Sequence, residues 1–166
     1  HWHVLVNDQG VVDPVAHANA GFVTVSRVGA CACCIGAVTM RASLVRLLRR
    51  RPARVLIEAS SQAHPAAIRA VLSEPGIAPA VRSVTVVCVL NGAMSAVNEE
   101  SAALIREQVA NADRLVVTRA ADTGTVTPVA AQLLGASAAP AEVAYTPDGK
   151  LKLRSLETAP PPGKPR

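Results

Sequence analysis

The chain has 166 residues, 50% of them hydrophobic, and its formal net charge at pH 7 is +5. This length fits one domain with a sizeable core, and because Trp2, Phe22 and Tyr145 are its only aromatic residues we expect a core of small aliphatic side chains. No apolar stretch reaches the ~20 residues that cross a bilayer and none has the pattern of a signal peptide, so we expect a cytoplasmic protein with no membrane partner.

Short apolar runs and helical patterns alternate along the chain. The runs, which we predict to be buried strands, are residues 4–6, 22–25, 55–57, 84–89 and 115–117, and the helical patterns are residues 38–50, 65–72, 99–109 and 126–134. This alternation predicts an α/β fold, a mostly parallel sheet with flanking helices. Functional loops are then expected at the carboxyl ends of the strands.

The pattern loosens after residue 135, so we place the main domain at residues 1–135. Residues 136–157 contain two apolar runs on either side of Pro147, Asp148 and Gly149, which predicts a hairpin. Residues 158–166 are proline-rich and basic, and we expect them to form a disordered tail.

Much of the positive charge lies in one short arginine-rich segment, made up of Arg46, Arg49, Arg50, Arg51 and Arg54. We interpret it as the solvated end of a helix, where cations interact favourably with the helix dipole. Aromatic side chains for base stacking are scarce, so we expect no nucleic-acid partner.

Three of the four cysteines, Cys31, Cys33 and Cys34, lie within four residues. Thiolates are ligands for soft metal ions, and the flanking Gly29 leaves the backbone free to turn so that the sulfur atoms converge on one ion. Independent core cysteines have no reason to cluster in this way. The run therefore predicts a metal site holding zinc, with copper(I) an alternative that accepts three thiolates.

Other interpretations of the cysteines stay open. The adjacent Cys33 and Cys34 can form a redox-sensitive thiol pair, and cysteine is also a common core residue, which is how we interpret Cys88. Zinc prefers four ligands, so three thiolates leave one position for water, for a partner's side chain or for a histidine. The candidate histidines are His1, His3, His17 and His64, although helix capping or solvent exposure before Pro65 suits His64 better.

Taken in order, five segments resemble the CobW-type metallochaperone GTPases. They are LVNDQG at 5–10, GACACC at 29–34, VLIEASSQAHP at 55–65, VTVVCVLNG at 84–92 and ADRLVVTRAAD at 112–122. In that family a VNEFG-like loop precedes a GCxCC metal motif, an ExxG-type switch, an aspartate after a strand and an NKxD guanine-recognition loop. The resemblance covers about residues 4–125.

This resemblance implies a P-loop NTPase-like fold in which Cys31, Cys33 and Cys34 bind zinc or cobalt for delivery to a client metalloprotein. Members of the family use GTP binding and hydrolysis, with magnesium, to load or release the metal. Asp8 then corresponds to the acidic residue of the VNEFG loop, and Glu58 to the switch glutamate near the magnesium and the γ-phosphate. An ordinary polar strand end explains Glu58 equally well.

The nucleotide motifs depart from the family pattern. No GxxGxGK[ST] segment occurs in this sequence, so the backbone cradle and the phosphate-binding lysine are lacking, together with the strand and helix that flank them. Ser61 stands at the switch glycine, Asn91 at the aspartate, and Thr118, Arg119, Ala120 and Ala121 at NKxD. Only Asp122 retains the carboxylate that contacts a guanine edge.

The sequence therefore predicts a CobW-like metal-binding protein with GTP binding and hydrolysis impaired or lost. The alternative is a GTP-hydrolysing metal chaperone whose P-loop lies upstream or in a partner chain. Because the P-loop strand is central to the family's sheet, we expect the remaining strands to close up, a second copy or another protein to fill the gap, or the chain to be part of a longer protein.

Overall fold

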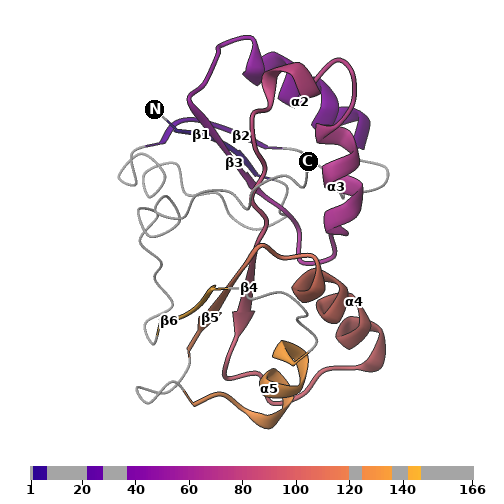
Figure 1. Cartoon of the computed structure of the whole chain (residues 1–166), viewed down its shortest axis with the longest axis vertical. Coiled ribbons are helices and arrows are strands. Elements are labelled where there is room, and N and C mark those ends of the chain that lie inside the picture. Colours follow the sequence, from indigo (N-terminus) through magenta and orange to yellow (C-terminus); the bar gives the residue numbers. More distant parts are fainter. Residues whose placement is uncertain (1, 7–21, 28–36, 120–124, 136–141, 147–166) are drawn as a thin grey trace, which may run out of the picture. The chain divides into compact units, whose positions relative to one another are not determined.

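The chain folds into two compact units, His1–Arg82 and Ser83–Arg166, which we call the N-terminal and C-terminal units. The computed structural model describes residues 2–6, 22–27, 37–119, 125–135 and 142–146 (Figure 1). Within these residues each unit contains one three-stranded sheet, in the orders β2-β1-β3 and β4-β5-β6, and all pairings are parallel. The predicted α/β fold with parallel strands and flanking helices is confirmed.

Strand β1 (Trp2–Val6) lies at the centre of the N-terminal unit's sheet, between β2 (Phe22–Arg27) and β3 (Arg54–Glu58). A central strand of a parallel sheet is covered on both faces, and residues 3–6 are accordingly all buried. Val6 pairs with Arg27 on one side and with Glu58 on the other. The carboxyl ends of the three strands are therefore level.

Helix α2 (Ala37–Leu48) buries one face against this sheet. Met40, Leu44 and Leu47 recur at helical spacing and are at most 4% exposed. Met40 and Leu44 share a core cluster with Leu5 of β1, while Arg46 of α2 is exposed.

Helix α3 (Pro65–Leu72) begins with a proline. A backbone N–H at this position would have no partner within the helix, so the lack of an N–H in proline costs the helix no hydrogen bond. Its Val71 joins the same core cluster as Ile77, which precedes the 3₁₀ turn η1 (Ala78–Ala80). A polar contact also ties α2 to the segment after α3, because the Arg41 guanidinium donates two hydrogen bonds to the Glu74 carboxylate. This hydrogen-bonded ion pair holds the pKa of Glu74 below its ordinary value.

The C-terminal unit is built around β5 (Arg114–Thr118), which lies between β4 (Val87–Asn91) and β6 (Glu142–Thr146). The predicted strand at 84–89 is wrong at its start, because β4 begins only at Val87. The Val86 N–H donates to the carboxylate of Asp113, which precedes β5, and the Val86 carbonyl accepts from the N–H groups of Asp113 and Arg114. β6 coincides with the first strand of the predicted hairpin and pairs in parallel with β5. The residues of the second hairpin strand, 151–153, and the tail at 158–166 lie outside the described residues.

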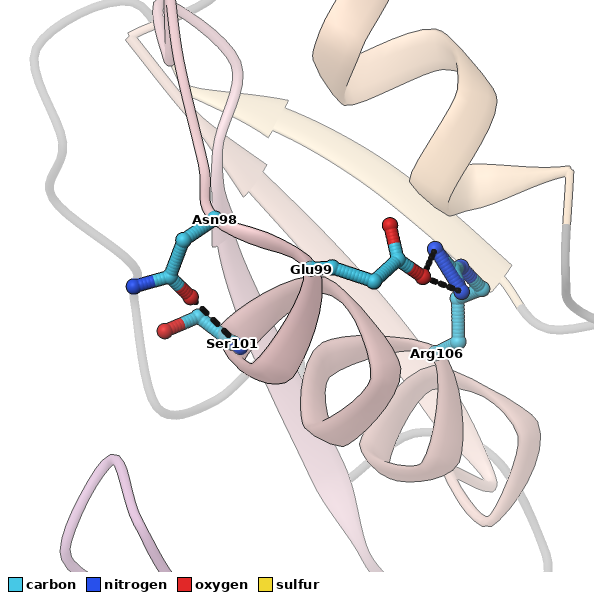
Figure 2. A network of polar contacts seen from close by, with 4 residues as sticks. All are labelled: Asn98, Glu99, Ser101 and Arg106. Atoms are coloured by element: carbon cyan, nitrogen blue, oxygen red, sulfur yellow. Dashed lines mark hydrogen bonds and ion pairs between the residues drawn. The ribbon is translucent and has the colours of Figure 1, made fainter.

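Two helices of this unit have side-chain caps. Asn98 accepts a hydrogen bond from the backbone N–H of Ser101 at the start of α4 (Glu99–Ala110), where Glu99 also pairs with Arg106 at 2.9 Å (Figure 2). Thr127 caps α5 (Pro128–Leu134) by accepting from the N–H of Ala130. Such caps satisfy N–H groups that have no partner within the helix.

None of the described helices combines the length and the apolar character needed to cross a lipid bilayer.

Gly92, directly after β4, lies where the chain has no room for a side chain. A methyl group built there would be 2.9 Å from Cγ1 of Val117 and 3.1 Å from the carbonyl oxygen of Thr118. The Gly92 N–H also donates to that carbonyl over 2.7 Å. The end of β4 therefore depends on glycine for its close approach to β5.

We expect Gly92→Ala to lower the free energy of unfolding by about 1–3 kcal/mol, because the added methyl forces the backbone away from β5. Urea denaturation measures this change. Gly76→Ala is the matched control, since nothing lies within 4 Å of a methyl at Gly76, and it should change stability by less than ~0.5 kcal/mol. Equal effects of the two substitutions would contradict the packing argument.

We expect Glu74→Gln to flatten the dependence of stability on acid pH. The Glu74 pKa is lowered in the folded chain by Arg41, so the ion pair stabilises the fold above the ordinary glutamate pKa of about 4.3 and is lost as pH falls through the folded value. Urea midpoints at a series of pH values below 6 measure the effect. Arg41→Gln should flatten the same curve, and unchanged curves for both variants would refute the assignment.

Candidate functional site

The level strand ends of the N-terminal unit form one edge from which the predicted metal and switch segments leave. Glu58 is the last residue of β3, and its exposed carboxylate makes no hydrogen bond or ion pair with another described residue. The structure thus places Glu58 at the carboxyl end of a parallel strand, as expected. An exposed carboxylate at this edge is accessible to a cation or to a nucleotide.

A tight turn follows Glu58. The Ala63 N–H donates to the Ser60 carbonyl over 2.9 Å, and the Gln62 N–H donates to Ser60 Oγ over 3.2 Å. Ser61 is exposed within this turn, while Ala63 is 3% exposed and anchors it. His64 occupies the N-cap position of α3 with an exposed side chain and without a side-chain capping bond.

The three clustered cysteines, Cys31, Cys33 and Cys34, lie outside the described residues, as do Asp8, His1 and His17. The described elements on either side define where their segment is attached. The chain leaves β2 at Arg27 and continues as α2 at Ala37. Within the part of the chain that the structure describes, no group of three or more His, Cys, Asp or Glu side chains lies close enough to hold a metal ion.

The fourth cysteine, Cys88, is partly buried in β4 and packs against the core cluster of Val109, Ala112 and Leu115. Burial raises the pKa of its thiol, because the apolar surroundings disfavour the thiolate. This agrees with the prediction that Cys88 is a core residue.

In the C-terminal unit the structure brings Asn91, Thr118 and Arg119 together at the strand ends. Asn91 and Thr118 are the last residues of β4 and β5 and are directly paired. The exposed Asn91 side chain accepts a hydrogen bond from the N–H of Ala93 over 3.0 Å. Its amide oxygen is therefore already engaged in the turn that follows β4.

Arg119 continues from Thr118 in a left-handed backbone conformation, with φ of 54°. This region is uncommon for a residue other than glycine and costs of order 1–3 kcal/mol. The conformation turns the chain sharply at the end of β5, and the Arg119 side chain is exposed. Ala120, Ala121 and Asp122, which complete the predicted guanine loop, lie outside the described residues.

Thr127, which organises this edge, was missed in the sequence. The Thr127 hydroxyl donates to the carbonyl of Met94, and the Thr127 N–H donates to the carbonyl of Gly92 over 3.0 Å. Thr127 thereby attaches the loop after β4 to the start of α5. The Thr-Pro pair at 127–128 is a helix-start signal that could have shown the cap, although not the contact with the loop.

Comparison with known proteins agrees with this arrangement. The family described as CobW/HypB/UreG, nucleotide-binding domain, matches residues 1–137. The zinc chaperone YeiR of Escherichia coli (strain K12) is 33% identical over 126 residues, which cover 71% of this chain and 37% of the relative. The chain thus spans little more than a third of that relative's length.

No solved structure shows significant similarity to this chain. The family match nevertheless covers most of both units, including the strand ends that carry Glu58, Asn91 and Thr118. The chain belongs to the CobW/HypB/UreG family of nucleotide-binding domains.

Proposed function

We propose that this protein binds zinc through Cys31, Cys33 and Cys34 and passes it to a client metalloprotein, with cobalt as the alternative metal. The cysteine run carries this proposal, because three thiolates within four residues suit a soft cation. The family membership and the zinc chaperone among the relatives support it.

The attachment of the cysteine segment suits a metal site. Cys31 follows the end of β2 by four residues, so it lies within about 14 Å of Arg27 at the greatest extension of the chain. Cys34 precedes α2 by three residues, a span of about 11 Å at most. Because β2 ends level with β3, the cysteines are tethered to the edge of the sheet that also carries Glu58.

Three thiolates leave one position in zinc's preferred tetrahedron for an exchangeable ligand. Water, the exposed His64 or a side chain of the client can occupy it. Entry of a client's thiolate or imidazole at this position begins transfer by ligand exchange. A site closed by four ligands of this chain would lack that route.

We further propose that GTP binding and hydrolysis are impaired. Asn91 presents a neutral amide where the family has an aspartate, and magnesium favours carboxylate oxygen. The Asn91 oxygen also accepts a hydrogen bond within its own turn. Thr118 and Arg119 replace the first two residues of the guanine-recognition motif, so the residues present fit magnesium and a guanine base poorly.

A second candidate function is GTP hydrolysis coupled to metal delivery, with the P-loop supplied upstream or by a partner chain. The match to a nucleotide-binding domain family favours it. In that case Glu58, exposed at the end of β3, is the residue placed to act near the γ-phosphate. The two candidates differ in whether the nucleotide cycle works, and both use the same cysteines.

Elemental analysis tests the metal site. We expect one zinc ion per chain, lost when Cys31, Cys33 and Cys34 are all replaced by serine and retained in Cys88→Ala, which removes the fourth thiol instead. Bound zinc should decrease as pH is lowered, because protons compete for the thiolates. Equal zinc content in the wild type and the triple variant would refute the assignment.

A nucleotide assay on this chain tests the proposed impairment of GTP hydrolysis. We expect the 166-residue chain to show no magnesium-dependent GTP hydrolysis above that of its Glu58→Gln variant. The assay measures phosphate release with and without magnesium. Hydrolysis by the wild type that Glu58→Gln abolishes would overturn the proposed impairment.

A further inference from the structure

We propose that an arginine surface on the N-terminal unit, formed by Arg46, Arg49, Arg50, Arg51 and Arg54, docks a carboxylate-rich segment of a partner protein. This inference rests on the proposed function, because a protein that hands on a metal must hold its client while the ligands exchange. It concerns an interaction surface separate from the cysteines.

All five guanidinium-bearing residues are exposed and lie on one continuous stretch of structure. Arg46 belongs to the last turn of α2, Arg49 to Arg51 form the turn that follows, and Arg54 begins β3. Residues 42–57 contain no aspartate or glutamate. The stretch therefore supplies no counter-charge of its own.

The described residues leave much of this charge unpaired. Arg46, Arg49 and Arg51 make no side-chain hydrogen bond or ion pair with any described residue. Arg41 of the same unit differs from these three arginines, because its guanidinium donates two hydrogen bonds to the Glu74 carboxylate. Arg46, Arg49 and Arg51 thus present forked donors that are available to an outside acceptor.

Helix capping does not account for the whole cluster. The helix dipole favours cations only in the last turn, whereas Arg51 and Arg54 follow the helix. Arg51 has φ of 49°, so the chain turns sharply between the helix and β3. Arg54 lies over the ring of Trp2, 5.3 Å from its centroid, which positions that guanidinium at the start of the strand.

Carboxylates fit this surface better than nucleic acid does. The cluster is short, and Trp2, the aromatic ring beside it, is already covered by Arg54. Single-stranded nucleic acid is typically held by a longer basic groove with free aromatic faces for base stacking. One arginine guanidinium can bind one carboxylate through two parallel hydrogen bonds. We therefore infer that the partner is an acidic protein segment.

The surface is also separated from the proposed metal site. The cysteine segment joins α2 at Ala37, and the arginines gather at the opposite end of this helix. Twelve helical residues span about 18 Å. A partner held by the arginines therefore binds away from the point where the cysteine segment joins α2.

The test compares two triple variants of equal charge. One carries Arg46→Gln, Arg49→Gln and Arg51→Gln, and the control carries Arg82→Gln, Arg106→Gln and Arg166→Gln at scattered positions. Fluorescence anisotropy measures binding of a labelled glutamate-glycine peptide and of a labelled oligothymidine with the same charge, at several salt concentrations. Circular dichroism verifies folding, and elemental analysis gives the zinc content of each preparation.

We expect the cluster variant to bind the peptide about tenfold more weakly than the wild type and the control to change affinity less than about twofold. The proposal would be overturned if the wild type did not bind the peptide, or if both variants lost peptide affinity equally. Tighter binding of oligothymidine than of peptide would also overturn it. The zinc measurement keeps the metal proposal and the docking proposal apart. A wild-type protein without zinc would refute the proposed metal function, whereas the docking surface is tested only by the difference in peptide affinity between the two variants.

Discussion

Parallel pairing in level register is the constraint on which the rest of this structure depends. In each unit the three strands run in the same direction and end side by side. Backbone hydrogen bonds thus align the segments that follow the strands, whatever their side chains. Glu58 in one unit, and Asn91 with Thr118 in the other, reach their sheet edges for this reason alone.

The apolar centre of each unit makes this alignment stable. β1 and β5 are buried over most of their length, and the helices pack aliphatic side chains against the sheets. Met40, Leu44 and Leu5 form the heart of one unit, and Leu90, Ala130 and Leu133 that of the other. The described core is thus aliphatic, as the scarcity of aromatic residues in the sequence leads one to expect.

The sequence predicted the strands well at their centres and poorly at their ends. Apolar runs identify the buried part of a strand, but pairing continues into polar residues such as Arg54, Asn91 and Thr118, which carry no hydrophobic signal. The prediction failed at Val84–Val86 for the opposite reason. The sequence there continues the apolar pattern of a strand, but β4 begins only at Val87, and Val86 bonds through its N–H to the side chain of Asp113. The positions of Glu58, Asn91 and Thr118 at strand ends were predictable from topology, whereas the contacts of Gly92 and Thr127 depend on the register between strands. The roles of the cysteines, Asp8 and Asp122 remain predictions.

The attachment of α2 has a consequence for the entropy of metal capture. The elements on either side of residues 28–36 are held in place, β2 by its ladder with β1, and α2 by the buried Met40 and Leu44 and by the contact of Arg41 with Glu74. A segment tethered at both ends has lost much of its freedom before any ligand arrives, so closing it around an ion costs less than ordering a free peptide of the same sequence. If these cysteines bind the metal as proposed, the fold itself raises the affinity of the cysteine run for that ion.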